Sequence, residues 1–116
     1  MRLNQPGIEH AVALFNESEA AHTVAGLSRT LGAPQVSVGA AAGSASAVRI
    51  TVAWELCWYQ WRVDIGEEMR AVTELAKGSE LYQLDISARH WNGRAADGQL
   101  LLGMPSRRRA MPVSAR

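Results

Sequence analysis

The clearest pattern along the chain is an alternation of apolar and polar positions that begins at residue 47. Through the first half of residues 47–65 the apolar side chains fall on even positions, while odd positions carry polar residues such as Arg49 and Glu55. A period of two is typical of a β-strand with one buried face, so we expect a strand here. The even set comprises Val48, Ile50, Val52, Trp54, Leu56 and Trp58.

The alternation changes parity in the middle of this stretch. From Tyr59 onward the apolar positions are odd, and they include Trp61. A shift of one residue moves every side chain to the other face of a sheet. We therefore expect one long strand with either a β-bulge near Trp58 and Tyr59 or a change of packing environment there. On this interpretation Trp54 and Trp58 share one face, and Trp61 lies on the other.

Two amphipathic helical segments are predicted before this strand. Apolar residues keep helical spacing over residues 8–15 and, more strongly, over residues 20–31, which indicates helices with one buried face. Asn16 followed three residues later by Glu19 resembles a capping box, so the second helix is expected to start afresh at Glu17. The glycine just after this helix, with a proline two residues further on, predicts its end.

The remaining elements are predicted from shorter patterns. Residues 36–41 alternate, and a small-residue loop separates them from residues 47–57, which favours a β-hairpin. Residues 67–77 suit either a helix, favoured by their residue types, or a strand that returns antiparallel to the aromatic one, and we favour the strand because so long a strand needs a partner. A short helix is predicted near residues 86–96, and a final short buried strand at residues 99–103.

Length and composition fit one folded domain. The chain has 116 residues, of which 47% are hydrophobic and 20% charged, close to the averages for globular proteins. Residues 104–116 contain two prolines and four arginines without apolar periodicity, which predicts a disordered tail. We expect a single α+β domain over residues 1–103, with an N-terminal helix or two short helices packed on an antiparallel sheet of three to four strands.

The charge distribution disfavours a nucleic-acid surface across the domain. The net charge of +1 hides an asymmetry, because residues 1–106 hold eight basic and eleven acidic residues, a net charge of −3. A protein that binds nucleic acid needs basic residues spread over one face. Eleven of the twelve basic residues are arginine and alanine is abundant, a bias that suggests a bacterial source.

The sequence also predicts a cytoplasmic protein without a membrane partner. The N-terminal residues contain no apolar leader, and no stretch approaches the length of a membrane span. The single cysteine excludes an intramolecular disulfide and fits a reducing compartment.

No motif of catalysis or metal binding is present. His10, His22 and His90 do not have zinc-ligand spacing. Cys57 lies between Leu56 and Trp58, and an apolar setting raises the pKa of a thiol and makes it inert. We therefore expect a non-enzymatic protein that needs no cofactor and no metal.

An aromatic cluster formed by Trp54, Trp58, Tyr59 and Trp61 is the first candidate binding site. Tryptophan has a large side chain whose N–H asks for a partner, and the change of parity places large aromatics on both faces of the sheet. The cover on each face could be the N-terminal helices, a protein partner or second copy of the chain, or a small molecule. The first of these alternatives makes the cluster ordinary core.

The second candidate site is the segment of residues 89–94. It brings Arg89, His90, Trp91, Asn92 and Arg94 together beside a turn, and such a group could hold an anion or a nucleotide by arginine pairing and ring stacking. The alternative is that the indole anchors the core while both arginines are solvated.

One pattern indicates nucleic acid. Residues 27–38 resemble the core of a helix-turn-helix, which gives an alternative DNA-binding element over residues 17–43. The recognition helix would offer only Gln35 and Ser37 to base edges and no Arg or Lys to phosphates. The β-hairpin explains the same residues better, so we disfavour a nucleic-acid partner.

The sequence thus predicts a small interaction or regulatory protein that self-associates or binds a protein partner through its Trp-rich strand. A DNA-binding regulator and a small anionic-ligand binder built on residues 89–94 are the alternatives.

Overall fold

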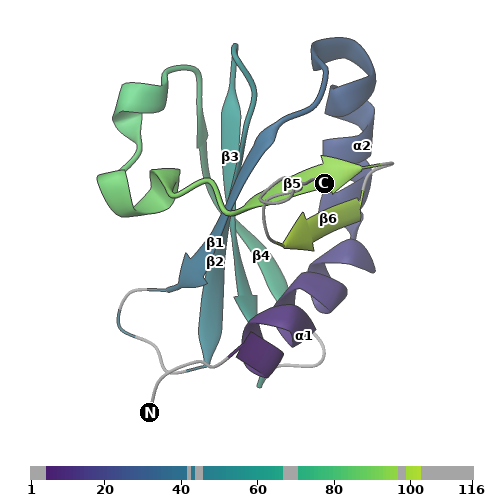
Figure 1. Cartoon of the computed structure of the whole chain (residues 1–116), viewed down its shortest axis with the longest axis vertical. Coiled ribbons are helices and arrows are strands. Elements are labelled where there is room, and N and C mark those ends of the chain that lie inside the picture. Colours follow the sequence, from purple (N-terminus) through teal and green to yellow (C-terminus); the bar gives the residue numbers. More distant parts are fainter. Residues whose placement is uncertain (1–4, 42, 44–45, 67–70, 97–98, 103–116) are drawn as a thin grey trace, which may run out of the picture.

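The computed structural model describes residues 5–41, 43, 46–66, 71–96 and 99–102. Two N-terminal helices pack on one face of a six-stranded antiparallel sheet whose strand order is β4-β3-β2-β1-β5-β6. Figure 1 shows these helices on one side of the sheet and, on the other side, the short green turns that connect β4 to β5. The α+β class is confirmed, but the sheet has six strands rather than three to four.

The helices are α1 (Gln5–Asn16) and α2 (Glu19–Leu31). The predicted break between them is present, but the N-cap of α2 is Ser18, whose hydroxyl accepts a hydrogen bond from the backbone N–H of Ala20 at 3.2 Å. The end of α2 is as predicted, because Gly32 caps it with a φ of 91°, a conformation that glycine adopts without steric cost.

Strands β1 (Gln35–Ala40) and β2 (Ala47–Ala53) form the predicted hairpin. The recognition helix of the helix-turn-helix alternative is therefore contradicted. The reason is the alternation of Val36 and Val38, both of which are buried on the helix side of the sheet, a pattern that suits a strand and not a helix.

The single long strand predicted over residues 47–65 is wrong. The chain reverses after β2, and β3 (Trp58–Asp64) returns antiparallel to it, with a hydrogen bond of 2.8 Å from the N–H of Trp54 to the carbonyl of Cys57 across the turn. Ala53 pairs with Trp58, so even positions on β2 face odd positions on β3. The change of parity therefore results from the reversal of the chain at residues 54–57. This turn contains no glycine or proline that would have predicted it.

Strand β4 (Val72–Gly78) pairs with β3 and confirms the predicted strand over that part of residues 67–77; residues 67–70 lie outside the described residues. A bulge does occur, but in the β3–β4 pairing. Gln60 pairs with Ala76 and Trp61 with Glu74, so Leu75 is the extra residue.

After β4 come two 3-10 turns, η1 (Leu81–Gln83) and η2 (Ile86–Arg89), and the strands β5 (Gly93–Ala96) and β6 (Gln99–Leu102). The short helix predicted near residues 86–96 is present only at its start, where η2 is a 3-10 helix. Its second half is a strand because the Asn92 amide bonds both backbone groups of Val38 at 2.8 Å, which holds this segment against β1. The last strand is confirmed, and the tail predicted at residues 104–116 lies outside the described residues.

The sheet separates two hydrophobic clusters. The larger one lies under the helices and is centred on Phe15, Val24 and Ile50, which are fully buried. The smaller one lies on the opposite face, where Trp58 and Leu84 are its large members. Within the described part of the chain, no helix is long and apolar enough to cross a membrane.

Candidate functional site

The three tryptophans of the β2–β3 hairpin are buried by the chain itself. Trp54 and Trp61 are 4% exposed on the helix side, and Trp58 is 6% exposed on the opposite face. The expectation that Trp54 and Trp58 share a face is wrong, because the chain reverses between them, and Trp54 packs in the helix-side cluster whereas Trp58, the first residue of β3, packs in the opposite one.

Ring contacts fix the helix-side aromatics in the core. Phe15 of α1 packs edge-on against Trp61 with ring centroids 5.0 Å apart, and Tyr59 stacks on the same indole at 5.5 Å. Trp54 meets Tyr59 edge-on at 6.4 Å. Such pairs add stability beyond the area that they bury. The N-terminal helices therefore supply the cover that the sequence left open.

The segment of residues 89–94 does not form one cluster. Trp91 is half-buried and packs against the small cluster around Trp58, whereas the side chain of Arg94 on β5 is exposed. Arg89 ends η2 and is half-buried. Only His90 and Asn92 of this segment line a common cavity.

That cavity is a hollow of about 450 Å³ between β1, β2 and the η2 turn, on the sheet face opposite the helices. We call it the Arg49 hollow. Its size falls in the range of small-molecule sites. The residues that line it are Ser37, Val38, Gly39, Ala40, Arg49, Asp85, Ser87, His90 and Asn92.

Arg49 supplies the positive charge of this hollow. Its guanidinium donates a hydrogen bond of 3.0 Å to the hydroxyl of Ser87 and lies 4.0 Å from the carboxylate of Asp85. Asp85 is 77% exposed, and an ion pair at this distance and exposure contributes little. Since a guanidinium has five N–H groups, Arg49 keeps donors for a ligand.

Ser37 supplies an unused polar group. The residue is 4% exposed and lines the hollow, yet its hydroxyl makes no hydrogen bond with any described residue. The hydroxyl is not among the fully buried unpaired atoms of the described residues, so it is open to the hollow and can donate to a bound group. Two residues further along β1, a side chain built at Gly39 would meet nothing within 4 Å, so the floor of the hollow is open there.

The two remaining polar residues have different roles. The Asn92 amide is fully committed to Val38, so it holds the wall of the hollow. His90 is exposed at the hollow and is able to turn a ring nitrogen toward a bound group.

Sequence reasoning missed Ser37, Arg49 and Ser87 as site residues. In the sequence, Arg49 and Ser37 occupy polar positions in the alternation that is typical of half-buried strands. Nothing in that pattern distinguishes them from other solvent-facing residues. The contact between Arg49 and Ser87 spans 38 residues, and no local pattern encodes it.

Two observations on the described residues concern Cys57 and metal ligands. Burial raises the pKa of the Cys57 thiol, which lowers the thiolate fraction at neutral pH. No three described His, Cys, Asp or Glu side chains are grouped to hold a metal ion.

Comparisons of this chain with known protein families, with curated proteins and with solved structures found no match.

Proposed function

We propose that this chain is a non-enzymatic binding protein for a small anionic ligand, a molecule with a carboxylate or phosphate group, held in the Arg49 hollow. The observation that carries the proposal is the hydroxyl of Ser37, which has no protein partner and opens into the same hollow as an arginine. A hydrogen-bond donor left free beside a guanidinium is complementary to the oxygens of an anion.

The binding geometry follows from the donors that remain free. Arg49 pairs with the anion through the N–H groups that it does not share with Ser87. The Ser37 hydroxyl donates from the floor, and His90 closes the side of the hollow. Asp85 is the competing group, because its carboxylate faces the same arginine.

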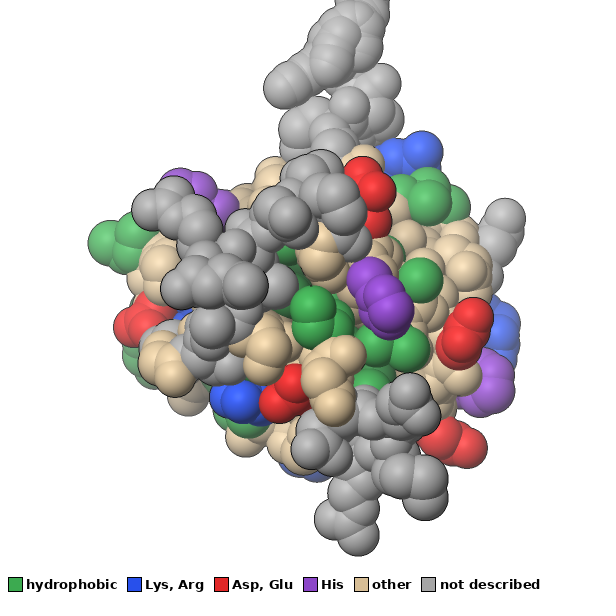
Figure 2. All heavy atoms as spheres, turned by 90° about the horizontal axis from the view of Figure 1, so that it is seen from below, with side chains coloured by type: hydrophobic (Ala, Val, Ile, Leu, Met, Phe, Trp, Pro, Cys, Tyr) green, Lys and Arg blue, Asp and Glu red, His purple; other side chains and the backbone are tan. Residues whose placement is uncertain are grey.

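The two other functions predicted from the sequence have less support. A partner surface on Trp54 and Trp58 would have to use side chains that are nearly fully buried. For nucleic acid, Figure 2 shows Lys and Arg side chains scattered singly among acidic, histidine and hydrophobic ones on the face in view. Nucleic-acid binding depends on many phosphate contacts from one continuous basic surface.

The test is a titration of the ¹⁵N-labelled chain with inorganic phosphate and with acetate at constant ionic strength, followed by NMR. We expect saturable shifts confined to residues 37–40, 49 and 85–92. Arg49→Gln and Ser37→Ala should each weaken binding about tenfold or more, because a hydrogen bond to a charged group contributes about 1.5–3 kcal/mol.

Three further variants sharpen the test. Arg29→Gln removes the same charge from the last turn of α2, away from the hollow, and should bind as the wild type does. Asp85→Asn should tighten binding because it removes the competing carboxylate, and Gly39→Val should abolish it by filling the floor. Equal shifts in the wild type and in Arg49→Gln would contradict the proposal.

A further inference from the structure

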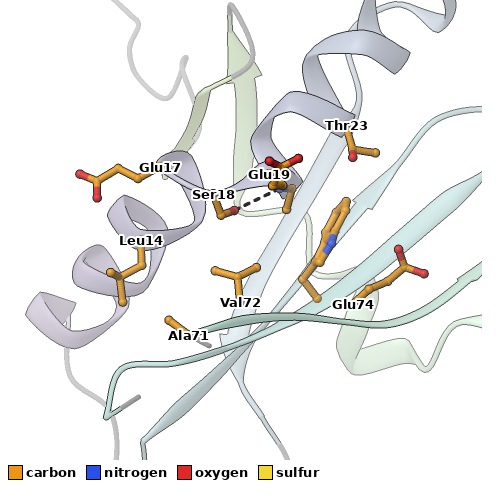
Figure 3. Close-up of a pocket in the computed structure, with 10 residues that line it drawn as sticks. Leu14, Glu17, Ser18, Glu19, Thr23, Ala71, Val72 and Glu74 are labelled. Carbon is orange, nitrogen blue, oxygen red and sulfur yellow. Dashed lines mark hydrogen bonds between the residues drawn. The ribbon is translucent and has the colours of Figure 1, made fainter. Parts of the chain in front are cut away.

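A second hollow lies on the helix side of the sheet, between the α1–α2 junction and β4. Its volume is about 480 Å³, within the range of small-molecule sites. Figure 3 shows Glu19 and Thr23 of α2 on one side and Val72 and Glu74 of β4 on the other, with Glu17 at the rim and directed outward. We call it the Glu74 hollow, and it shares no residue with the Arg49 hollow.

The described residues that line this hollow carry charge of one sign. Three of these ten residues are glutamates, Glu17, Glu19 and Glu74, and none of the ten is basic. All three are exposed, and no described residue forms a salt bridge with them. Glu17 is directed outward, but the unpaired carboxylates of Glu19 and Glu74 lie on two sides of the cavity and favour a cation. Because the described residues include no group suited to a metal ion, the favoured cation is organic.

The indole N–H of Trp61 is the second, independent observation. Trp54 and Trp58 each donate their indole N–H to a backbone carbonyl, that of Gly32 at 3.0 Å and that of Glu80 at 2.9 Å. Trp61 is just as buried and lines the Glu74 hollow, but its N–H has no partner among the described residues. The N–H is not among the fully buried unpaired atoms of the described residues, so it is open to the hollow, where it can donate to a ligand.

The two observations together define the ligand more narrowly than either one. The carboxylates favour a positive charge, while the indole N–H is complementary to an acceptor oxygen on the same molecule. We propose that the Glu74 hollow binds a small ligand with a primary ammonium group and an oxygen acceptor on the neighbouring carbon. Glu19 and Glu74 hold the ammonium, and Trp61 donates to the oxygen.

Three amines carry this chemistry from different sources, and they serve as probes. Ethanolamine represents amino alcohols, glucosamine represents amino sugars, and glycinamide represents the amino end of a peptide. Glucose matches glucosamine without the ammonium, and cyclohexylammonium has the ammonium without the oxygen. Each is added to the ¹⁵N-labelled full chain at constant ionic strength, and the indole N–H resonance of Trp61 is assigned with Trp61→Phe.

We expect at least one of the three amines to shift the Trp61 indole resonance saturably, and the one that binds most tightly identifies the source. Glucose and cyclohexylammonium should bind at least about tenfold more weakly, since each lacks one of the two interactions. Glu19→Gln and Glu74→Gln should each weaken binding several-fold. Glu55→Gln, at the exposed turn of the β2–β3 hairpin, removes the same charge elsewhere and should have no effect.

Two results would overturn the proposal. One is an indole resonance that none of the three amines moves. The other is a shift that survives unchanged in both Glu19→Gln and Glu74→Gln. Phosphate and acetate binding at the Arg49 hollow is measured on different resonances from amine binding at the Glu74 hollow. The two proposals can therefore be confirmed or contradicted independently.

Discussion

At the scale of single residues, the space beside a strand decides what a position tolerates. Gly78 ends β4, and a methyl group built there would lie 2.6 Å from the ring of Trp58. Gly39 on β1 occupies the same kind of strand position with open space around it. Neither glycine has a positive φ, so the two differ in packing and not in backbone conformation.

We therefore predict opposite outcomes for one substitution at these two sites. Gly78→Ala should destabilise the fold by about 1–3 kcal/mol, because a rigid indole must move to admit the methyl group. Gly39→Ala should be neutral or slightly stabilising, since alanine reduces the freedom of the unfolded chain. Urea unfolding of the two variants and the wild type gives both values, and a Gly78→Ala chain as stable as Gly39→Ala would show that the indole adapts.

That the tryptophans need cover was predictable at this scale, but neither what covers them nor the face on which each indole lies was predictable. Residue type alone indicates that Trp54, Trp58 and Trp61 need cover. Which two share a face depends on where the chain turns, and the turn at residues 54–57 contains no residue type that marks it.

At the scale of elements, one side chain joins the beginning of the chain to its end. Asn16, the last residue of α1, accepts a hydrogen bond from the N–H of Leu100 at 2.8 Å and donates one to the carbonyl of the same residue at 3.1 Å. These bonds pair backbone groups of β6, the outermost strand on this edge of the sheet. Unpaired backbone groups at a sheet edge can pair with other chains. At Leu100 the side chain of Asn16 makes the hydrogen bonds that a further strand would make.

Asn16→Ala should accordingly cost about 1–3 kcal/mol, because both backbone groups of the buried Leu100 lose their partner. Asn16→Asp keeps the acceptor for the N–H and loses the donor, so it should fall between alanine and the wild type. Hydrogen exchange at the Leu100 amide should accelerate in the alanine variant. Gln99→Ala, which removes only an exposed contact of 3.4 Å to the carbonyl of Asn16, is the control and should change little.

The sequence interpretation of Asn16 illustrates what local patterns miss. The spacing from Asn16 to Glu19 resembles a capping box, yet the cap is Ser18 and Asn16 bonds a residue 84 positions away. The Asn16 amide could form hydrogen bonds either as a cap of α2 or with the backbone of Leu100. The local pattern indicates only the cap, because it contains no information on Leu100.

At the scale of the whole molecule, the two hydrophobic clusters share one sheet. On β2 and β3, Ile50 and Trp61 point to the helix side of the sheet, whereas Ala53 and Trp58 point to the opposite face. If either cluster is lost, one face of β2 and β3 is exposed, and the other cluster depends on the same two strands. The molecule should therefore unfold as one cooperative unit, as small single domains usually do.

Tryptophan fluorescence and far-UV circular dichroism should consequently report the same urea midpoint. Leu84→Ala truncates a buried residue of the smaller cluster and should lower the free energy of unfolding by about 2–5 kcal/mol. The urea midpoints of both signals should therefore fall together. A fluorescence change that precedes the loss of strand signal would instead show that the segment from η1 to η2 opens separately.

The sequence by itself determined the α+β class, the two helices and their break, the β1–β2 hairpin and the last strand. Each of these depends on apolar periodicity or on a turn residue within a few positions, which is information that neighbouring residues carry. Only the tertiary structure decided the reversal at residues 54–57, the six-stranded order and both hollows. Arg49 contacts Ser87, and Trp61 and Glu19 line the same hollow, only after distant segments pack together. Periodicity states which face of an element is buried, but not which distant residue will lie against it.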